Sequence, residues 1–69
     1  MKKLLKQYGF NSDMQYFEMI AESYDNGQIM QAKEQFAALP KENRTAMVKA
    51  LINGNWALPN GKELAVTLL

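Results

Sequence analysis

Few side chains of this chain could do chemistry, because its 69 residues include no histidine and no cysteine. Glu18 and Glu22 stand four residues apart, which places two carboxylates on one face of a helix. Glycosidases and sites for hard metal ions use carboxylates in this way. The same face also holds Gln15 and Asp25, so a solvated surface explains the pair better than a catalytic or metal site.

The two serines offer no activated nucleophile. Ser12 precedes a helical pattern, and Gln15 three residues later completes a capping box. Ser23 has no plausible base near it in the sequence. Glycine-rich phosphate loops are absent too, since Asn53-Gly54-Asn55 and Asn60-Gly61 are isolated turns. We therefore expect that the protein is not an enzyme and that it uses no cofactor and no metal.

Composition places the chain among small globular domains. Hydrophobic residues make up 48% of it, too many for a disordered tail, and 69 residues allow one domain, here residues 1–69. The net charge of +1 gives no strong reason to expect nucleic acid or an anionic membrane. No window approaches the roughly 20 apolar residues that span a bilayer, and Lys6 interrupts the signal-like opening. We expect a cytoplasmic protein that uses no membrane.

Hydrophobic periodicity and helix-ending residues predict the elements that would position any site. The predicted helices cover residues 2–8, 13–26, 28–39 and 40–53. In this order, they end at Gly9, Gly27, Pro40 and Gly54. Pro40 can also be the first residue of the next helix, where its missing N–H is harmless. The predicted fold is all-α, a compact bundle of four to five short helices.

The tail, residues 55–69, supports two interpretations. Asn60 with Glu63 three residues later can cap a short helix that runs through Leu69. The segment Leu58-Pro59-Asn60-Gly61-Lys62 is also suited to a β-hairpin turn with Gly61 in the left-handed conformation. We prefer the helix, because Leu and Ala favour it.

Helical projection divides the apolar residues into a core and a remainder. The predicted core is Phe17, Ile20, Tyr24, Ile29, Phe36, Leu39, Val48, Leu51 and Ile52. Met19, Met30 and Ala37 fall off the core stripes, with Tyr16 at a margin. Met19 and Met30 flank the Gly27 turn, where a two-fold axis would let the same patch bury itself in a homodimer.

Two further residues could anchor a partner. Arg44 lies on the apolar side of its helix, where its stem could cover the core while the guanidinium reaches water or an acidic residue of the second helix. Arginine is also enriched at binding hot spots. Trp56 follows a helix stop and could either fill the core or bind a partner. The candidate partner-binding residues are Tyr16, Met19, Met30, Arg44 and Trp56.

Two resemblances accompany this interpretation. The spacing of Gly27, Ala32 and Phe36 resembles the latter part of a tetratricopeptide repeat, although Pro40 comes too early and no second copy exists. The resemblance implies an αα-hairpin in which Ala32 allows close helix approach. The whole chain also resembles small helical proteins of phage and mobile elements of gut Bacteroidales bacteria, which have no assigned activity. This resemblance rests on the run from Gly27-Gln28 through Phe36 and on Leu39-Pro40-Lys41.

The function that follows is a non-catalytic protein–protein interaction module, a small accessory or regulatory protein that binds a protein partner or itself. The alternative is a small DNA-binding regulator that uses residues 28–39 and 40–53 as a helix-turn-helix. Against it, the joining turn holds Pro40 where that motif usually has glycine, Glu34 and Glu42 dilute the positive charge, and the polar positions of residues 40–53 form no basic stripe.

Overall fold

The structure, a computed structural model, describes residues 1–54 and 61–69. These residues form helices and no strands, as predicted for an all-α bundle. The helices are α1 (Lys2–Tyr8), α2 (Asp13–Asp25), α3 (Ile29–Ala37), α4 (Lys41–Ile52) and α5 (Gly61–Leu68). None of the helices in the described ranges is long and apolar enough to cross a membrane.

Local chemistry sets most helix ends where the sequence predicts them. The capping box at the start of α2 is present: Gln15 N donates to Ser12 Oγ at 3.4 Å and Ser12 N donates to Gln15 Oε1 at 3.3 Å. Gly9, Gly27 and Gly54 follow α1, α2 and α4 with φ of 73°, 81° and 71°. Pro40 differs from its predicted place, because its ψ of 151° puts it at the extended N-cap position before α4.

The tail is helical where the structure describes it. Residues Gly61–Leu68 form α5, and Gly61 is its first residue, so the hairpin interpretation, with Gly61 in the left-handed conformation, is wrong. A cap at Asn60 would fall outside the described residues. Gly61 instead permits a close approach, since a Cβ atom there would lie 3.1 Å from the backbone oxygen of Leu51 in α4.

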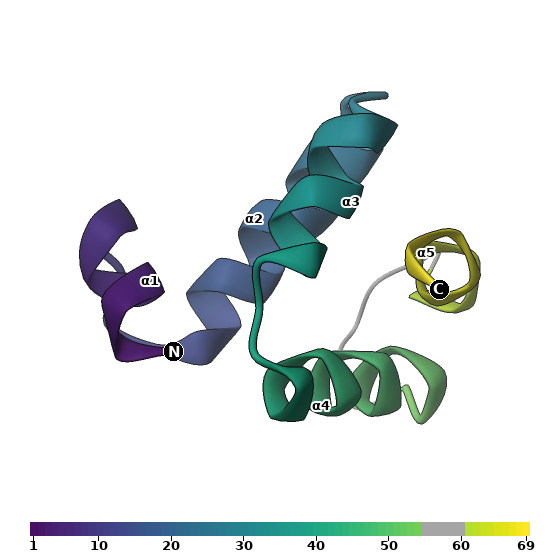
Figure 1. The fold of residues 1–69 in the computed structure, drawn as a ribbon. Coiled ribbons are helices and arrows are strands. Elements are labelled where there is room, and N and C mark those ends of the chain that lie inside the picture. Colours follow the sequence, from purple (N-terminus) through teal and green to yellow (C-terminus); the bar gives the residue numbers. More distant parts are fainter. Residues whose placement is uncertain (55–60) are drawn as a thin grey trace.

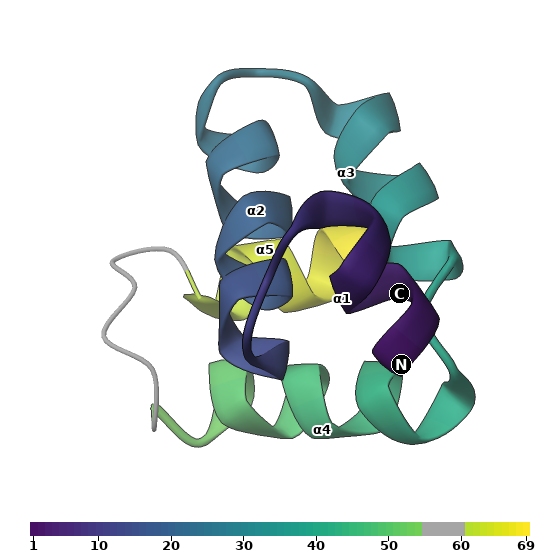
Figure 2. The ribbon, with the colours of Figure 1, turned by 90° about the vertical axis from the view of Figure 1, so that its left-hand side faces the viewer.

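The helices pack as a hairpin with further helices around it. Helices α2 and α3 lie side by side as an antiparallel αα-hairpin, and α4 runs across its base (Figures 1 and 2). Helix α5 packs against both α4 and α3. Asn43 Nδ2 donates to Asp13 Oδ2 at 3.1 Å, which joins the first turn of α4 to the first turn of α2.

The buried apolar residues come from α2, the α3 region, α4 and α5. They are Tyr16, Phe17, Ile20, Ala21, Ala32, Phe36, Leu39, Met47, Leu51, Leu64, Ala65 and Leu68. Five residues of the predicted core are therefore confirmed: Phe17, Ile20, Phe36, Leu39 and Leu51. Tyr24, Ile29 and Val48 are only partly buried.

Ile52 was wrongly predicted to lie in the core, because its side chain is 50% exposed. Met47 and Leu51, four residues apart, are the α4 residues that face inward. The next position along a helix is rotated by about 100°, as the 3.6-residue turn requires. Ile52 therefore faces away from the core that Leu51 enters.

Tyr16 lies at the centre of the core rather than at its margin, with no exposed surface. Its ring stands nearly perpendicular to the rings of Tyr8 and Phe10, at centroid distances of 5.6 and 6.4 Å. Its hydroxyl donates to the backbone oxygen of Gln35 in α3, at 2.9 Å. The segment before α2 thus folds back over Tyr16, which the periodicity of α2 alone does not indicate.

Candidate functional site

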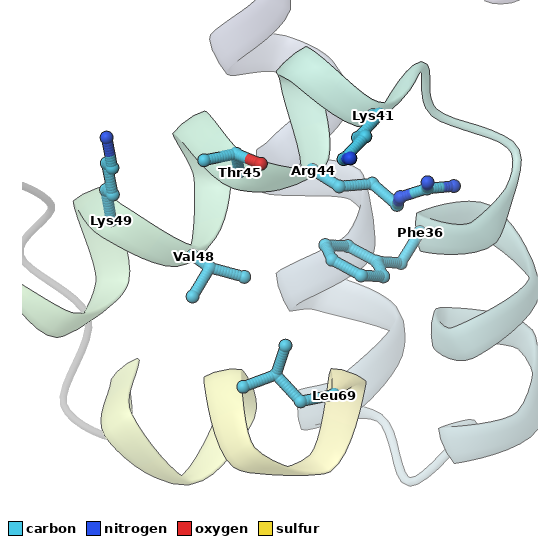
Figure 3. Close-up of a pocket in the computed structure, with 7 residues that line it drawn as sticks. All are labelled: Phe36, Lys41, Arg44, Thr45, Val48, Lys49 and Leu69. Atoms are coloured by element: carbon cyan, nitrogen blue, oxygen red, sulfur yellow. The ribbon is translucent and has the colours of Figure 1, made fainter.

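A groove of about 460 Å³ opens where the end of α3, the length of α4 and the end of α5 meet. Its volume falls within the range of about 300–1,000 Å³ that is typical of ligand sites. We call it the α4 groove, and it is lined by Phe36, Lys41, Arg44, Thr45, Val48, Lys49 and Leu69 (Figure 3).

The floor of the α4 groove is apolar and comes from three separate elements. Phe36 belongs to the last turn of α3, Val48 to α4, and Leu69 directly follows α5. Figure 3 shows the three side chains converging on the same hollow. Phe36 and Val48 also pack with the core, whereas Leu69 is 82% exposed. The floor therefore continues the core outward to solvent.

The rim of the α4 groove is positively charged. Lys41, Thr45 and Lys49 are spaced four residues apart and so form one row along α4. Arg44 stands beside this row, three residues after Lys41. The sequence analysis counted Glu42 against a basic stripe on this helix, but Glu42 does not line the groove.

Arg44 is tied to the end of α3. Its Nη1 donates to the backbone oxygens of Leu39 and Ala37, at 3.2 and 3.4 Å. Carbonyls at a helix C-terminus lack intrahelical partners and carry partial negative charge, which favours a cation there. From the sequence, the guanidinium was expected to reach water or an acidic residue of α2, whereas these two hydrogen bonds go to backbone oxygens. The guanidinium both closes the α3–α4 turn and adds charge to the groove.

Of the candidate partner-binding residues that the structure describes, only Arg44 lines the α4 groove. Tyr16 is fully buried and Met19 is partly buried against the core, so neither forms an exposed patch. Met30 is 70% exposed on α3, away from the groove. Trp56 lies outside the described residues.

Sequence reasoning missed the groove because its members were assigned to other roles. Phe36 and Val48 were predicted as core residues, and Lys41 and Lys49 were considered only as cations of a possible helix-turn-helix. The four-residue spacing of Lys41, Thr45 and Lys49 was the available signal. It became meaningful only once α5 brought Leu69 to the same face.

Polar groups between α2 and α3 have structural partners rather than catalytic ones. Ser23 Oγ lies 2.9 Å from Gln35 Oε1 and 3.1 Å from the backbone oxygen of Met19. Burial raises the pKa of the Tyr16 phenol, with a further contribution from Tyr8. Within residues 1–54 and 61–69, no group of three or more His, Cys, Asp or Glu side chains is arranged to hold a metal ion.

A second hollow differs from the α4 groove in its charge. Tyr24 and the α5 residues Lys62, Glu63, Val66 and Thr67 line it. It therefore pairs one basic with one acidic side chain, whereas the α4 groove combines three basic side chains with an apolar floor. Charge of one sign around an apolar hollow makes the α4 groove the better candidate site.

Comparisons of the chain with models of protein families, with curated proteins and with solved structures found no match.

Proposed function

We propose that this domain is a non-catalytic protein–protein interaction module that binds its partner in the α4 groove. The observation that carries the proposal is the apolar floor of Phe36, Val48 and Leu69 below a rim of three cations. Interfaces combine an apolar centre with a polar rim, and aromatic and arginine residues are enriched in them. The groove offers both components on one face.

Leu69 is the most informative member of this surface. Single exposed apolar residues are ordinary on protein surfaces. Leu69, however, is 82% exposed and borders a hollow that also exposes parts of Phe36 and Val48. Covering these side chains with a partner would remove their apolar surface from water, at a gain of about 25 cal/mol per Å².

DNA binding remains the alternative, and the three cations could also meet phosphates. The apolar floor favours a protein partner, because a phosphate backbone has nothing to place among Phe36, Val48 and Leu69. Phosphate contacts also make affinity fall steeply with salt. A salt series with random duplex DNA therefore separates the two functions.

The test compares two exposed apolar residues near the same end of α5. Leu69→Asp places a charge in the α4 groove, whereas Val66→Asp is the matched control, because Val66 is 74% exposed and lies outside the groove. A partner captured from the source cell is identified by mass, purified and titrated against each variant. We expect Leu69→Asp to weaken binding by more than about tenfold, or 1.4 kcal/mol, and Val66→Asp to leave it unchanged.

Two results would overturn this proposal. One is a purified partner that binds Leu69→Asp as tightly as the parent protein. The other is strongly salt-dependent retention of duplex DNA with no protein partner.

Self-association, and action in the cytoplasm, remain predictions from the sequence within this proposal. Met30 still offers an exposed apolar side chain for a homodimer, but Met19 no longer adjoins it on an exposed patch. Sedimentation at tens of micromolar tests the homodimer directly. A mass near one chain, unchanged by Met30→Glu, would contradict it.

A further inference from the structure

We infer that the α4 groove recognises an acidic, apolar peptide segment of the partner. A carboxylate of that segment binds at Lys41 and Arg44, and a large apolar side chain of the same segment enters among Phe36, Val48 and Leu69. This inference rests on the proposed function and specifies the chemistry of the occupant.

The charged residues that line the groove are all of one sign. The chain holds eight basic and seven acidic residues, yet the groove is lined by Lys41, Arg44 and Lys49 and by no acidic residue. Potentials of opposite sign meet across specific interfaces, and like charges brought together cost several kcal/mol. A basic segment is therefore disfavoured in the groove, and an acidic one is attracted.

Arg44 is the best-prepared of the three cations to bind a carboxylate. Its bonds to Leu39 O and Ala37 O hold the guanidinium in place through Nη1. An arginine has five N–H donors in a rigid fork, so donors remain on Nη2 and Nε. Because the side chain is already ordered, a carboxylate binding there loses less conformational entropy than at a free lysine.

The lysines extend the basic rim on both sides of Arg44. Lys41 lies one turn before Arg44, and the two side chains stand next to each other in Figure 3. Lys49 lies eight residues after Lys41, or about 12 Å along the helix. This length matches about four residues of extended peptide, at roughly 3.3 Å each. A short segment with acidic residues near both ends of an apolar one would fit.

A displayed library of random short peptides tests the inference. Peptides that bind the parent protein but not Leu69→Asn are selected, which restricts them to the α4 groove without adding a charge that would itself repel acidic peptides. We expect their sequences to be enriched in Asp and Glu around a Leu, Phe or Trp. Their affinities, measured by fluorescence anisotropy, should weaken as the salt concentration rises.

Charge reversal on the protein gives the decisive control. Lys41→Glu with Lys49→Glu should weaken binding of the selected peptides by about tenfold, since each exposed pair contributes roughly 0.2–1 kcal/mol and reversal also adds repulsion. The matched control is Lys33→Glu with Lys62→Glu, two lysines outside the groove, and should have little effect. Peptides with Asp and Glu replaced by Lys should bind the groove-reversed protein better than the parent. Circular dichroism melting confirms that both variants are folded.

Three results would overturn the inference, and they differ in what they say about the proposed function. Groove-dependent peptides that are neutral or basic would refute the acidic occupant but support a protein partner. A complete lack of groove-dependent peptides would refute the acidic occupant, and the partner titration with Leu69→Asp would still decide the proposed function. Random duplex DNA that binds more tightly than any peptide would refute both.

Discussion

The α2–α3 hairpin and the α4–α5 face use their side chains in opposite ways. In the hairpin, polar groups find partners within the fold: the Tyr16 hydroxyl donates to Gln35 O, and Ser23 Oγ lies within hydrogen-bonding distance of Gln35 Oε1. Ala32 is fully buried at the interface that the two helices share. Nothing in this interior is left for a partner to contact.

On the α4–α5 face, the two helices contact each other closely at one point and leave a solvent-exposed groove beside it. Gly61 brings the start of α5 against Leu51 of α4, and Leu64, Ala65 and Leu68 complete the contact with the core. Beside it, Leu69 and the basic rim remain exposed. The comparison fits the proposal that a partner binds on the α4–α5 face rather than on the hairpin.

Phe36 belongs to both regions, so its truncation should have the largest effect. Phe36→Ala should lower the free energy of unfolding by about 3–5 kcal/mol, because it removes a buried ring and leaves a cavity. Met30→Ala on the exposed side of α3 is the control and should change it by less than about 0.5 kcal/mol. Thermal melting measures both. A cooperative Phe36→Ala protein with an unchanged Tm would refute the central place of this ring.

Tyr16→Phe tests the internal polar contacts of the hairpin. Gln35 lies in the last turn of α3, where a continuing helix would have Leu39 N donate to Gln35 O. Leu39 N donates to Phe36 O instead. Removing the hydroxyl therefore deprives Gln35 O of a donor, and we expect a loss of about 1–2 kcal/mol by urea unfolding. A loss below about 0.5 kcal/mol would mean that water replaces the hydroxyl.

The same variant changes the response to alkaline pH. The pKa of the Tyr16 phenol is raised above its ordinary 10.0 in the folded protein, through burial and through Tyr8. The unfolded phenol ionises first, so stability present below pH 10 falls as the pH rises toward the folded pKa. Tyr16→Phe should lose less stability over this window than the parent, as measured by urea unfolding at a series of pH values.

Gly27 tests the turn that allows the hairpin to close. Its φ of 81° is unfavourable for side chains other than glycine, although a Cβ atom there would meet no atom within 4 Å. Gly27→Ala should therefore cost about 1 kcal/mol through the backbone alone. Gly27→Asn should cost less, because asparagine tolerates this conformation. Equal losses would indicate a steric cause instead.

The smallest stability effect is expected at Leu69, and the adjacent Leu68 supplies the contrast. Leu69→Asp should change the free energy of unfolding by less than about 0.5 kcal/mol, as expected for an exposed site. Leu68→Ala should lower it by about 2 kcal/mol, because it truncates a buried side chain. Similar melting temperatures for the two variants would remove the distinction between core and groove.

The sequence predicted what is locally determined. The capping box at Ser12 and Gln15 and the glycine stops depend on neighbouring residues, and the structure confirms them. Whether the side chains of Tyr16 and Ile52 are buried depends on which distant segments pack against them, and the burial of both was predicted wrongly. The groove depended on α5, for which the sequence also allowed a hairpin. Its floor is assembled from Phe36, Val48 and Leu69, which no local pattern connects.

The stability of helix α1 determines how often the buried Tyr16 is exposed to solvent. None of the α1 residues is buried, although Leu4 and Leu5 pack partly against the core. Short helices with few buried contacts open locally at a lower free energy than the rest of the fold. In amide hydrogen exchange, α1 should therefore exchange before the helices of the hairpin. Since Tyr8 and Phe10 cover the Tyr16 ring, the most deeply buried aromatic residue should meet solvent each time α1 opens, without unfolding of the domain.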